Sequence, residues 1–425
     1  MFEKFTLALK LPDLRKKIFF VFAMLVIFRL VAVIPVPGVD PGRLKAFLAG
    51  NQFFGLLNVF SGGVLDNLSI VMLGVGPYIT ASIIMQLLTM MFPRLKEMYQ
   101  EEGEAGRAKF NQYSRLLTVP LALLQSCALL IVLMRQQILP PLGLLGYATS
   151  MITVTAGTLF LMWLGELISE KNIGNWISLL IFAGIVSRLP VDFRQAFLAS
   201  NPFEDPSVIP LYLALAAVAI VVIAGVVIIS EGQRNIPVSY AKRIRGNRIF
   251  GGVQTHLPLR VNQAGVIPII FAISIILFPG LIGNFLASVH QATVQAISQF
   301  LVQLLNNQWV YGGLYFVLVF LFTYFYTAVT FDPQAIATNI QKQGGFILGL
   351  RPGRPTAEFL YRILNRITLF GALFLGAIAI LPLAVQAGFG IQALTIGGTS
   401  LLIVVSVVLE TLKQINAQLV MHEYE

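Results

Sequence analysis

Few side chains in this sequence could perform covalent or acid–base chemistry. Its one cysteine, Cys127, lies in the apolar run ALLQSCALL and leaves no partner for an intrachain disulfide. The three histidines, His256, His290 and His422, are far apart and lack the spacing of metal ligands. No GxxxxGK[ST] motif is present that could hold nucleotide phosphates. We therefore expect no enzyme activity, no metal and no cofactor.

The charged side chains avoid the middle of the apolar runs. Glu166, Glu231, Asp332 and Glu410 fall at the ends of such runs, and Arg29 is the clearest exception. An ion-coupled transporter usually needs a carboxylate deep in the membrane, and the sequence shows none there, so a transporter of small solutes is only the second hypothesis. An intramembrane protease would need a Ser/His pair or paired aspartates at mid-depth, and the histidines lie in or beside loops.

The composition predicts an all-α integral membrane protein. Hydrophobic residues make up 57% of the 425 and charged residues 11%, and the mean hydropathy is +0.81. A membrane-spanning helix needs about 20 mostly apolar residues. The first run ends in IPVPG and is too long for a signal peptide, so we expect it to remain as a span. Ten runs are candidates: 18–34, 74–92, 115–134, 150–168, 173–189, 209–229, 263–282, 309–329, 366–385 and 393–410.

Basic residues predict the orientation of these spans. With both termini in the cytoplasm, the inside segments carry 23 of the 29 Lys and Arg residues, the outside loops carry 5, and Arg29 is the remaining one. Cytoplasmic loops are enriched in Lys and Arg, so this bias supports ten spans in that orientation. The net charge of +10 is then mostly a topology signal, and we expect no DNA partner.

Ten spans divide into five and five. Because each half has an odd number of spans, the halves are expected to be inverted relative to each other, as in proteins with a pathway at the repeat interface. We expect an N-terminal half over residues 1–189 and a C-terminal half over residues 190–425.

Glycine and proline interrupt the apolar segment 50–77. Gly62-Gly63 and Gly76-Pro77 break it, and Asp66-Asn67 lies between them. Irregular backbone cannot face lipid, so this stretch should re-enter the protein from outside as a short helix. An ordinary amphipathic external loop is the alternative.

Two inside loops, 230–262 and 330–366, are long and basic. Both mix β-branched, aromatic and basic residues with turn signals. They are expected to form protruding hairpins or short helices that dock a large acidic partner. A loop that only sets topology and touches lipid headgroups is the alternative.

Several long stretches resemble the SecY family, the central subunits of the protein-conducting translocon. The matching stretches include FRLVAVIPVPGVD, VFSGGVLDNLSIVMLGVGPYITASIIMQLL, GELISEKNIGNWISLLIFAGIV, NIPVSYAKRIRGNRIFGGVQTHLPLRVNQAGVIPIIFA and FTYFYTAVTFDPQAIATNIQKQGGFILGLRPGRPT. The resemblance covers nearly the whole chain. It implies ten helices in two inverted halves around an hourglass pore, which passes unfolded polypeptides outward and releases apolar segments sideways into lipid.

The resemblance also implies functional positions. The plug would span about 55–73 and include Ser61, Gly62, Gly63, Asp66 and Asn67. The pore ring would comprise Ile79, Ile83, Ile177, Ile181, Ile270 and Ile403. Independently, Ile79 and Ile83 are four residues apart, as are Ile177 and Ile181, so each pair shares a helix face. Ordinary helix packing would also explain any one of these isoleucines.

The lateral gate would lie between the second and seventh spans, with candidates Ser82, Gln86, Asn262, Ser274 and Phe278. The basic loops would dock the SecA motor or the ribosome through Lys242, Arg243, Arg248 and Arg351. Further implied partners are SecE, SecG, precursors bearing signal sequences, and the lipid bilayer of the bacterial inner membrane. Two residues depart from the family pattern, namely Trp176 and Asn247.

Overall fold

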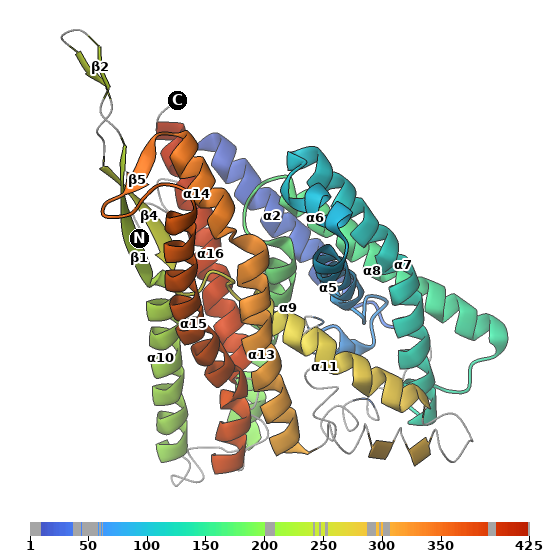
Figure 1. The fold of residues 1–425 in the computed structure, drawn as a ribbon. Coiled ribbons are helices and arrows are strands. Elements are labelled where there is room, and N and C mark those ends of the chain that lie inside the picture. The colour runs from blue at the N-terminus through green and yellow to red at the C-terminus, as the bar shows by residue number, and fades with distance from the viewer. Residues whose placement is uncertain are drawn as a thin grey trace.

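The computed structural model is a bundle of long helices with a small sheet at one end (Figure 1). It describes residues 10–36, 44, 58, 61, 63–199, 209–240, 243–245, 248–250, 254–286, 295–296, 299–300, 307–389 and 397–423. Within these residues, ten long helices coincide with the ten expected spans: α2 (Pro12–Val31), α5 (Gly76–Met91), α7 (Gly103–Arg135), α8 (Leu144–Ser169), α9 (Trp176–Ala199), α10 (Ile209–Glu231), α11 (Ile267–Leu286), α13 (Gln308–Thr330), α15 (Arg354–Phe389) and α16 (Gly397–Glu423).

Local chemistry explains several helix ends. Pro77 occupies the first turn of α5, where its missing N–H is not needed. The backbone bends by 113° after Met91, where Pro93 starts the short helix α6 (Pro93–Gln100). The Asn307 side chain caps α13 by accepting hydrogen bonds from two backbone N–H groups of the first turn.

Length and composition mark most of these helices as membrane-spanning. Among the described residues, six helices are long and apolar enough to cross a bilayer, and there are seven if the bent α5–α6 pair is one span. The other three expected spans coincide with α2, α9 and α11. Helix α2 carries a cluster of cations in its first turns, and the well-described parts of α9 and α11 are short apolar helices.

The outer surface of the bundle is apolar. Phe22 of α2, Leu124 of α7, Val221 of α10 and Phe370 of α15 are between 64 and 70% exposed. Such a band of large exposed apolar side chains is typical of a surface solvated by lipid. The other faces of these helices pack into one large apolar core, which includes residues from all ten helices.

Two groups of helices meet in this core. Helix α7 packs between α5 and α8, while α15 packs between α13 and α16, and α16 also packs on α10. Contacts between the two groups are made by α11, which lies against α5 and α7, and by α16, which lies against α9. The interfaces α5–α11 and α9–α16 therefore join the first five long helices to the last five.

The two basic loops share one antiparallel sheet. Strand β1 (Gln233–Tyr240) lies between β4 (Gln254–Arg260) of its own loop and β5 (Gly345–Ile347) of the other loop. Val238 is in register with Thr255 on one side and with Ile347 on the other. The sequence predicted a hairpin or short helix in each loop, which is confirmed, but it did not predict that the loops pair with each other.

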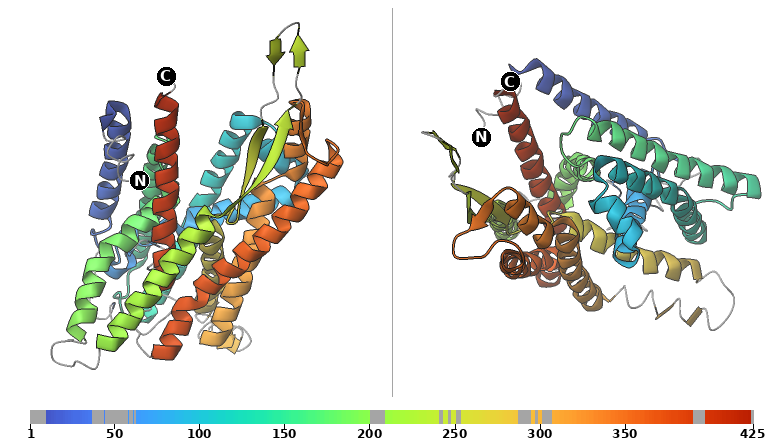
Figure 2. Two further views of the ribbon diagram at one scale, coloured as in Figure 1. Left: turned by 90° about the vertical axis from the view of Figure 1, so that its left-hand side faces the viewer. Right: turned by 45° about the horizontal axis from the view of Figure 1, so that its top comes forward.

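A second small core holds this sheet in place. Ile236 and Val238 of β1 pack with Ile340 of α14 (Pro333–Lys342) and with Leu360 and Ile363 near the start of α15. Beyond the sheet, the ribbon formed by β2 (Arg243–Arg245) and β3 (Arg248–Phe250) projects away from the bundle (Figures 1 and 2). The sheet, α6, α14 and the C-terminal end of α16 all lie at the same end of the molecule (Figure 1).

Candidate functional site

The structure brings the six candidate ring isoleucines into one apolar cluster. They come from four helices: α5, α9, α11 and α16. Ile177 is partly buried and packs against the cluster. The other five are at most 3% exposed: Ile79, Ile83, Ile181, Ile270 and Ile403. All six therefore belong to the large apolar core of the bundle or border it.

The broken segment before α5 lies inside the protein. Leu65–Asn67 forms the single-turn helix η1, and Val64, Leu65 and Leu68 are at most 1% exposed. Its backbone runs beside the end of α2, where the Val36 N–H donates to the Leu68 carbonyl at 2.9 Å. These residues belong to the same apolar core as the isoleucines. The prediction of a buried short helix is confirmed, and the alternative of an external loop is wrong for these residues.

Asn58 organises the turn that precedes η1. Its side-chain Oδ1 accepts from the Leu65 N–H at 3.1 Å, and its carbonyl accepts from the Gly63 N–H at 2.7 Å and from Ser61 Oγ at 3.0 Å. Position 63 favours glycine, because its φ of +76° is a left-handed conformation that residues with a side chain rarely adopt. The sequence prediction overlooked Asn58, although an asparagine ahead of a Gly-Gly pair is a turn signal.

The remaining plug candidates are placed only in part. Asn67 is exposed at the end of η1, and the backbone of Asp66 lies within η1. Gly62 lies outside the described residues. A further close approach fixes the segment from the other side, because a Cβ on Gly157 of α8 would overlap the Ile70 carbonyl.

Ser82 and Gln86 form a polar pair on α5, one helical turn apart. Gln86 Nε2 donates to Ser82 Oγ at 3.2 Å, while Gln86 Oε1 is buried and has no hydrogen-bond partner within the described part of the chain. An unpaired buried acceptor costs about 1–3 kcal/mol. This cost applies to the Gln86 carbonyl oxygen, since only the amide N–H group of Gln86 has a described partner.

The polar groups in and just before α11 also donate within their own segment. Ser274 Oγ donates to the Ile270 carbonyl at 2.9 Å, one turn back on the same helix. Just before α11, Asn262 Nδ2 donates to the Gly265 carbonyl at 3.1 Å, and its buried Oδ1 has no partner among the described residues. Phe278 lies in α11, but its side chain is outside the described part. Among the described side chains, no hydrogen bond joins α5 to α11.

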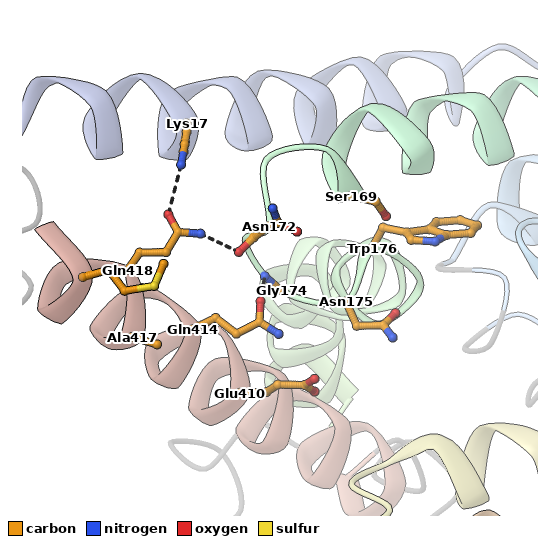
Figure 3. A pocket seen from close by; sticks show the side chains of 11 residues that line it. Lys17, Ser169, Asn172, Gly174, Asn175, Trp176, Glu410, Gln414, Ala417 and Gln418 are labelled. Atoms are coloured by element: carbon orange, nitrogen blue, oxygen red, sulfur yellow. Dashed lines mark hydrogen bonds between the residues drawn. The ribbon is translucent and has the colours of Figure 1, made fainter. Parts of the chain in front are cut away.

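A polar cleft of about 810 Å³ lies between α2, the turn from α8 to α9, and α16 (Figure 3). Gln418 of α16 bridges the other two elements: its Oε1 accepts from Lys17 Nζ at 3.4 Å, and its Nε2 donates to the Asn172 carbonyl at 2.8 Å. One turn earlier, Gln414 Oε1 accepts from the Gly174 N–H at 2.5 Å. The sequence analysis did not single out either glutamine, since isolated polar residues on a terminal helix usually face solvent.

Trp176 closes one side of this cleft. Its indole ring occupies the space over Gly165 of α8, where any Cβ would overlap the ring. Its ring centroid is 5.0 Å from that of Tyr78 on α5. Trp176 therefore links three helices, and Gly165 makes room for it.

The docking candidates lie on the exposed end of the molecule. Arg351 is exposed in the turn before α15, where Thr356 Oγ1 donates to its carbonyl at 2.9 Å. The backbones of Arg243 and Arg248 lie in β2 and β3 of the projecting ribbon. Lys242 and Asn247 are outside the described residues.

Comparison with known proteins identifies the family. A family model described as SecY matches residues 69–412. The chain belongs to the SecY family. A protein translocase subunit SecY of Streptomyces galbus is 44% identical over 444 residues, which cover 100% of this chain and 99% of the relative. The function is accordingly that of a non-enzymatic, protein-conducting membrane channel, which decides against the solute-transporter alternative.

Solved structures share the fold. One, a SecY channel whose plug domain is described as stabilising the closed state and maintaining a membrane seal, has a TM-score of 0.65 at 22% identity and covers 94% of this chain and 91% of its own. Another, Sec61 in a canine ribosome–channel complex, has a TM-score of 0.63 at 19% identity with the same coverage. The expected fold, helices around a pore with a plug, is confirmed.

Proposed function

We propose that unfolded secretory polypeptides pass through the isoleucine cluster and that apolar segments leave sideways between α5 and α11. The observation that carries this proposal is that isoleucines of four helices lie in or against the apolar core that also contains the η1 segment. In this arrangement the cluster is the ring and residues 55–73 are the plug.

An isoleucine ring suits a seal that must also let a chain through. β-Branched side chains have few rotamers and present a stiff apolar rim. An apolar constriction blocks ions by excluding water and needs no charge that would bind the passing polypeptide. The η1 segment packs into the same core and reinforces this seal when no polypeptide is present.

The α5–α11 interface suits a lateral exit. No described side-chain hydrogen bond has to break when these helices separate. The free acceptors Gln86 Oε1 and Asn262 Oδ1 could be satisfied by water or by the N–H groups of a passing chain. Transfer of an apolar segment from the channel to lipid is favourable by about 25 cal/mol per Å² of apolar surface.

Residues 1–189 and 190–425 would act as the two halves of a clamp. The hydrogen bonds of Gln414 and Gln418 support this division, because they attach α16 of the second half to α2 and to the α8–α9 turn of the first. They lie on the α9–α16 side, so this side would stay closed while α5 and α11 part.

Energy for transport would come from outside the chain, since the sequence contains no P-loop. The exposed basic loops are the surfaces on which we place the SecA motor and the ribosome, with Arg351 as the main contact. SecE and SecG would complete the assembly in the bacterial inner membrane. Both termini would be cytoplasmic, because the basic segments gather at one end.

Site-specific crosslinking tests the pathway. A photoreactive amino acid at Ile83 or Ile270 should crosslink to a precursor stalled during translocation. The matched control is Ile220 of α10, which is 66% exposed on the outer surface and should give no adduct. Equal crosslinking at Ile220 and Ile83, or none at Ile83 and Ile270, would contradict the proposed pathway.

A further inference from the structure

Two aromatic side chains join the start of α9 to the start of α5. The ring centroids of Trp176 and Tyr78 are 5.0 Å apart, and the ring planes are tilted by 54°. Each of these residues directly precedes a candidate ring isoleucine, since Trp176 comes before Ile177 and Tyr78 comes before Ile79. The aromatic pair therefore connects the two helices at the point where their isoleucines begin.

The backbones of α5 and α9 pack mainly on other helices. Helix α5 lies chiefly against α7 and α11, whereas α9 lies against α8, α2 and α16. A direct link between α5 and α9 therefore depends on side chains that are long enough to reach across. A tilted pair of aromatic rings suits this task, because it is rigid and buries a large apolar area.

Two further features hold Trp176 in contact with Tyr78. Gly165 of α8 leaves room for the indole ring, since a Cβ at this position would overlap it. Asn175 caps α9, because its Oδ1 accepts from the Ile177 N–H at 3.0 Å and from the Ser178 N–H at 3.4 Å. The cap fixes the first turn of α9, and with it the direction of the Trp176 side chain.

We propose that Trp176 and Tyr78 are positioning residues, which hold α5 and α9 in one arrangement so that the ring isoleucines of the first half move as a unit. This inference rests on the proposed function. Helices α5, α8 and α9 all belong to the first half, so the aromatic pair stays intact when α5 and α11 part. Opening then moves Ile270 and Ile403 of the second half relative to a fixed set, namely Ile79, Ile83, Ile177 and Ile181.

The resting ion conductance of the full-length chain in planar bilayers, with potassium chloride on both sides, tests this role. Trp176→Ala and Tyr78→Ala should each raise the mean conductance about two- to tenfold, the factor by which one aromatic pair shifts an equilibrium. The double variant should rise no further than either single variant, because both remove the same contact. Trp176→Phe keeps a ring over Gly165 and should retain most of the seal.

Two control variants separate this role from a general loss of stability. Trp163→Ala removes a tryptophan of the same half that is 54% exposed and contacts Phe160 instead. Leu360→Ala removes a fully buried side chain from the second core beneath the sheet and should lower the thermal unfolding midpoint. Both variants should leave the resting conductance unchanged.

Ile83→Ser reports on the ring itself and should raise the conductance. If Ile83→Ser leaks but neither Trp176→Ala nor Tyr78→Ala does, the positioning role is wrong and the proposed pathway stands. If Ile83→Ser does not leak, the ring is wrong and the positioning role fails with it. Additive effects of Trp176→Ala and Tyr78→Ala, or an equal leak in Leu360→Ala, would also overturn the inference.

Discussion

The α5–α11 and α9–α16 interfaces join the same two groups of helices in different ways. Between α5 and α11 the described polar side chains bond within their own helix or segment, and two buried oxygens have no partner. Around the C-terminal end of α16, glutamine side chains bond directly to α2 and to the α8–α9 turn. Among the described side chains, no hydrogen bond joins α5 to α11, whereas α16 makes cross-element hydrogen bonds.

This difference supports the roles that we propose for the two sides, in which α5 and α11 separate and the α9–α16 side stays closed. A net hydrogen bond contributes about 0.5–1.5 kcal/mol, so the bonds of Gln414 and Gln418 together stabilise the α16 side by a few kcal/mol. Opening the α5–α11 side breaks no such bond and relieves two unsatisfied acceptors. A channel that opens toward lipid needs one interface that separates easily and another that keeps the two halves together.

Crosslinking each side should give the largest contrast. In a Cys127→Ser background, Ser82→Cys/Ser274→Cys joined by a flexible bis-maleimide should lower translocation at least about tenfold, or about 1.4 kcal/mol in barrier height. Asn172→Cys/Gln418→Cys joined in the same way should leave the rate nearly unchanged. The measurement is export of a precursor into proteoliposomes, with unreacted variants as controls. A block by the second crosslink alone would reverse our assignment of the moving side.

Gly165→Ala should disrupt the α8–α9 packing on the closed side. The new methyl group would overlap the Trp176 ring, and overpacking of a buried site typically costs about 1–3 kcal/mol. Thermal unfolding of the detergent-solubilised chain should show a lower midpoint. In a Trp176→Gly background, Gly165→Ala should cost less than in the unsubstituted chain, because the clash is absent. If the two effects simply add, the two side chains are not in contact as described.

Gln414→Ala/Gln418→Ala should destabilise the attachment of α16 by about 1.5–4.5 kcal/mol, the sum of the three net hydrogen bonds described above. The expected result is a lower unfolding midpoint together with exchange of the Gly174 amide proton on a shorter timescale. Gln112→Ala, on an exposed position of α7, is the matched control and should change neither value. An unchanged exchange rate at Gly174 would show that the hydrogen bonds of Gln414 and Gln418 contribute little to local stability.

Gln86→Leu should have the smallest effect. It removes an unsatisfied acceptor and also the bond to Ser82, so the closed interface should gain only about 1 kcal/mol. Precursor export should slow by a few-fold while the unfolding midpoint stays the same or rises. Faster export would mean that Gln86 helps to hold the interface shut.

Hydropathy predicted the spans well where lipid contact determines them. Helix α10 runs over Ile209–Glu231, against an expected 209–229. Hydropathy did not predict how far two of the helices extend beyond the apolar run. Helix α15 begins at Arg354, not at residue 366, and α16 continues to Glu423, not to residue 410. These extensions are amphipathic, and an apolar window detects only the lipid-facing portion. The boundary near 189 also falls inside α9, which continues to Ala199.

Long-range pairing was beyond reach of the sequence alone. The spacing of Ile79 and Ile83 predicts a shared face, but not that isoleucines of α9, α11 and α16 lie in the same apolar core. The pairing of β1 with β5 likewise has no local signal, because its partners come from different loops. The roles of the ring, plug and gate residues stay predictions that the experiments above can test.

The shared sheet has a mechanical consequence. Strand β1 continues directly from α10, β4 leads to α11, and β5 lies between α14 and α15. A force applied to either basic loop is therefore shared by the same three-stranded sheet, which connects to several helices. Two partners bound to different loops would both act on this one sheet, which leads through β4 to α11.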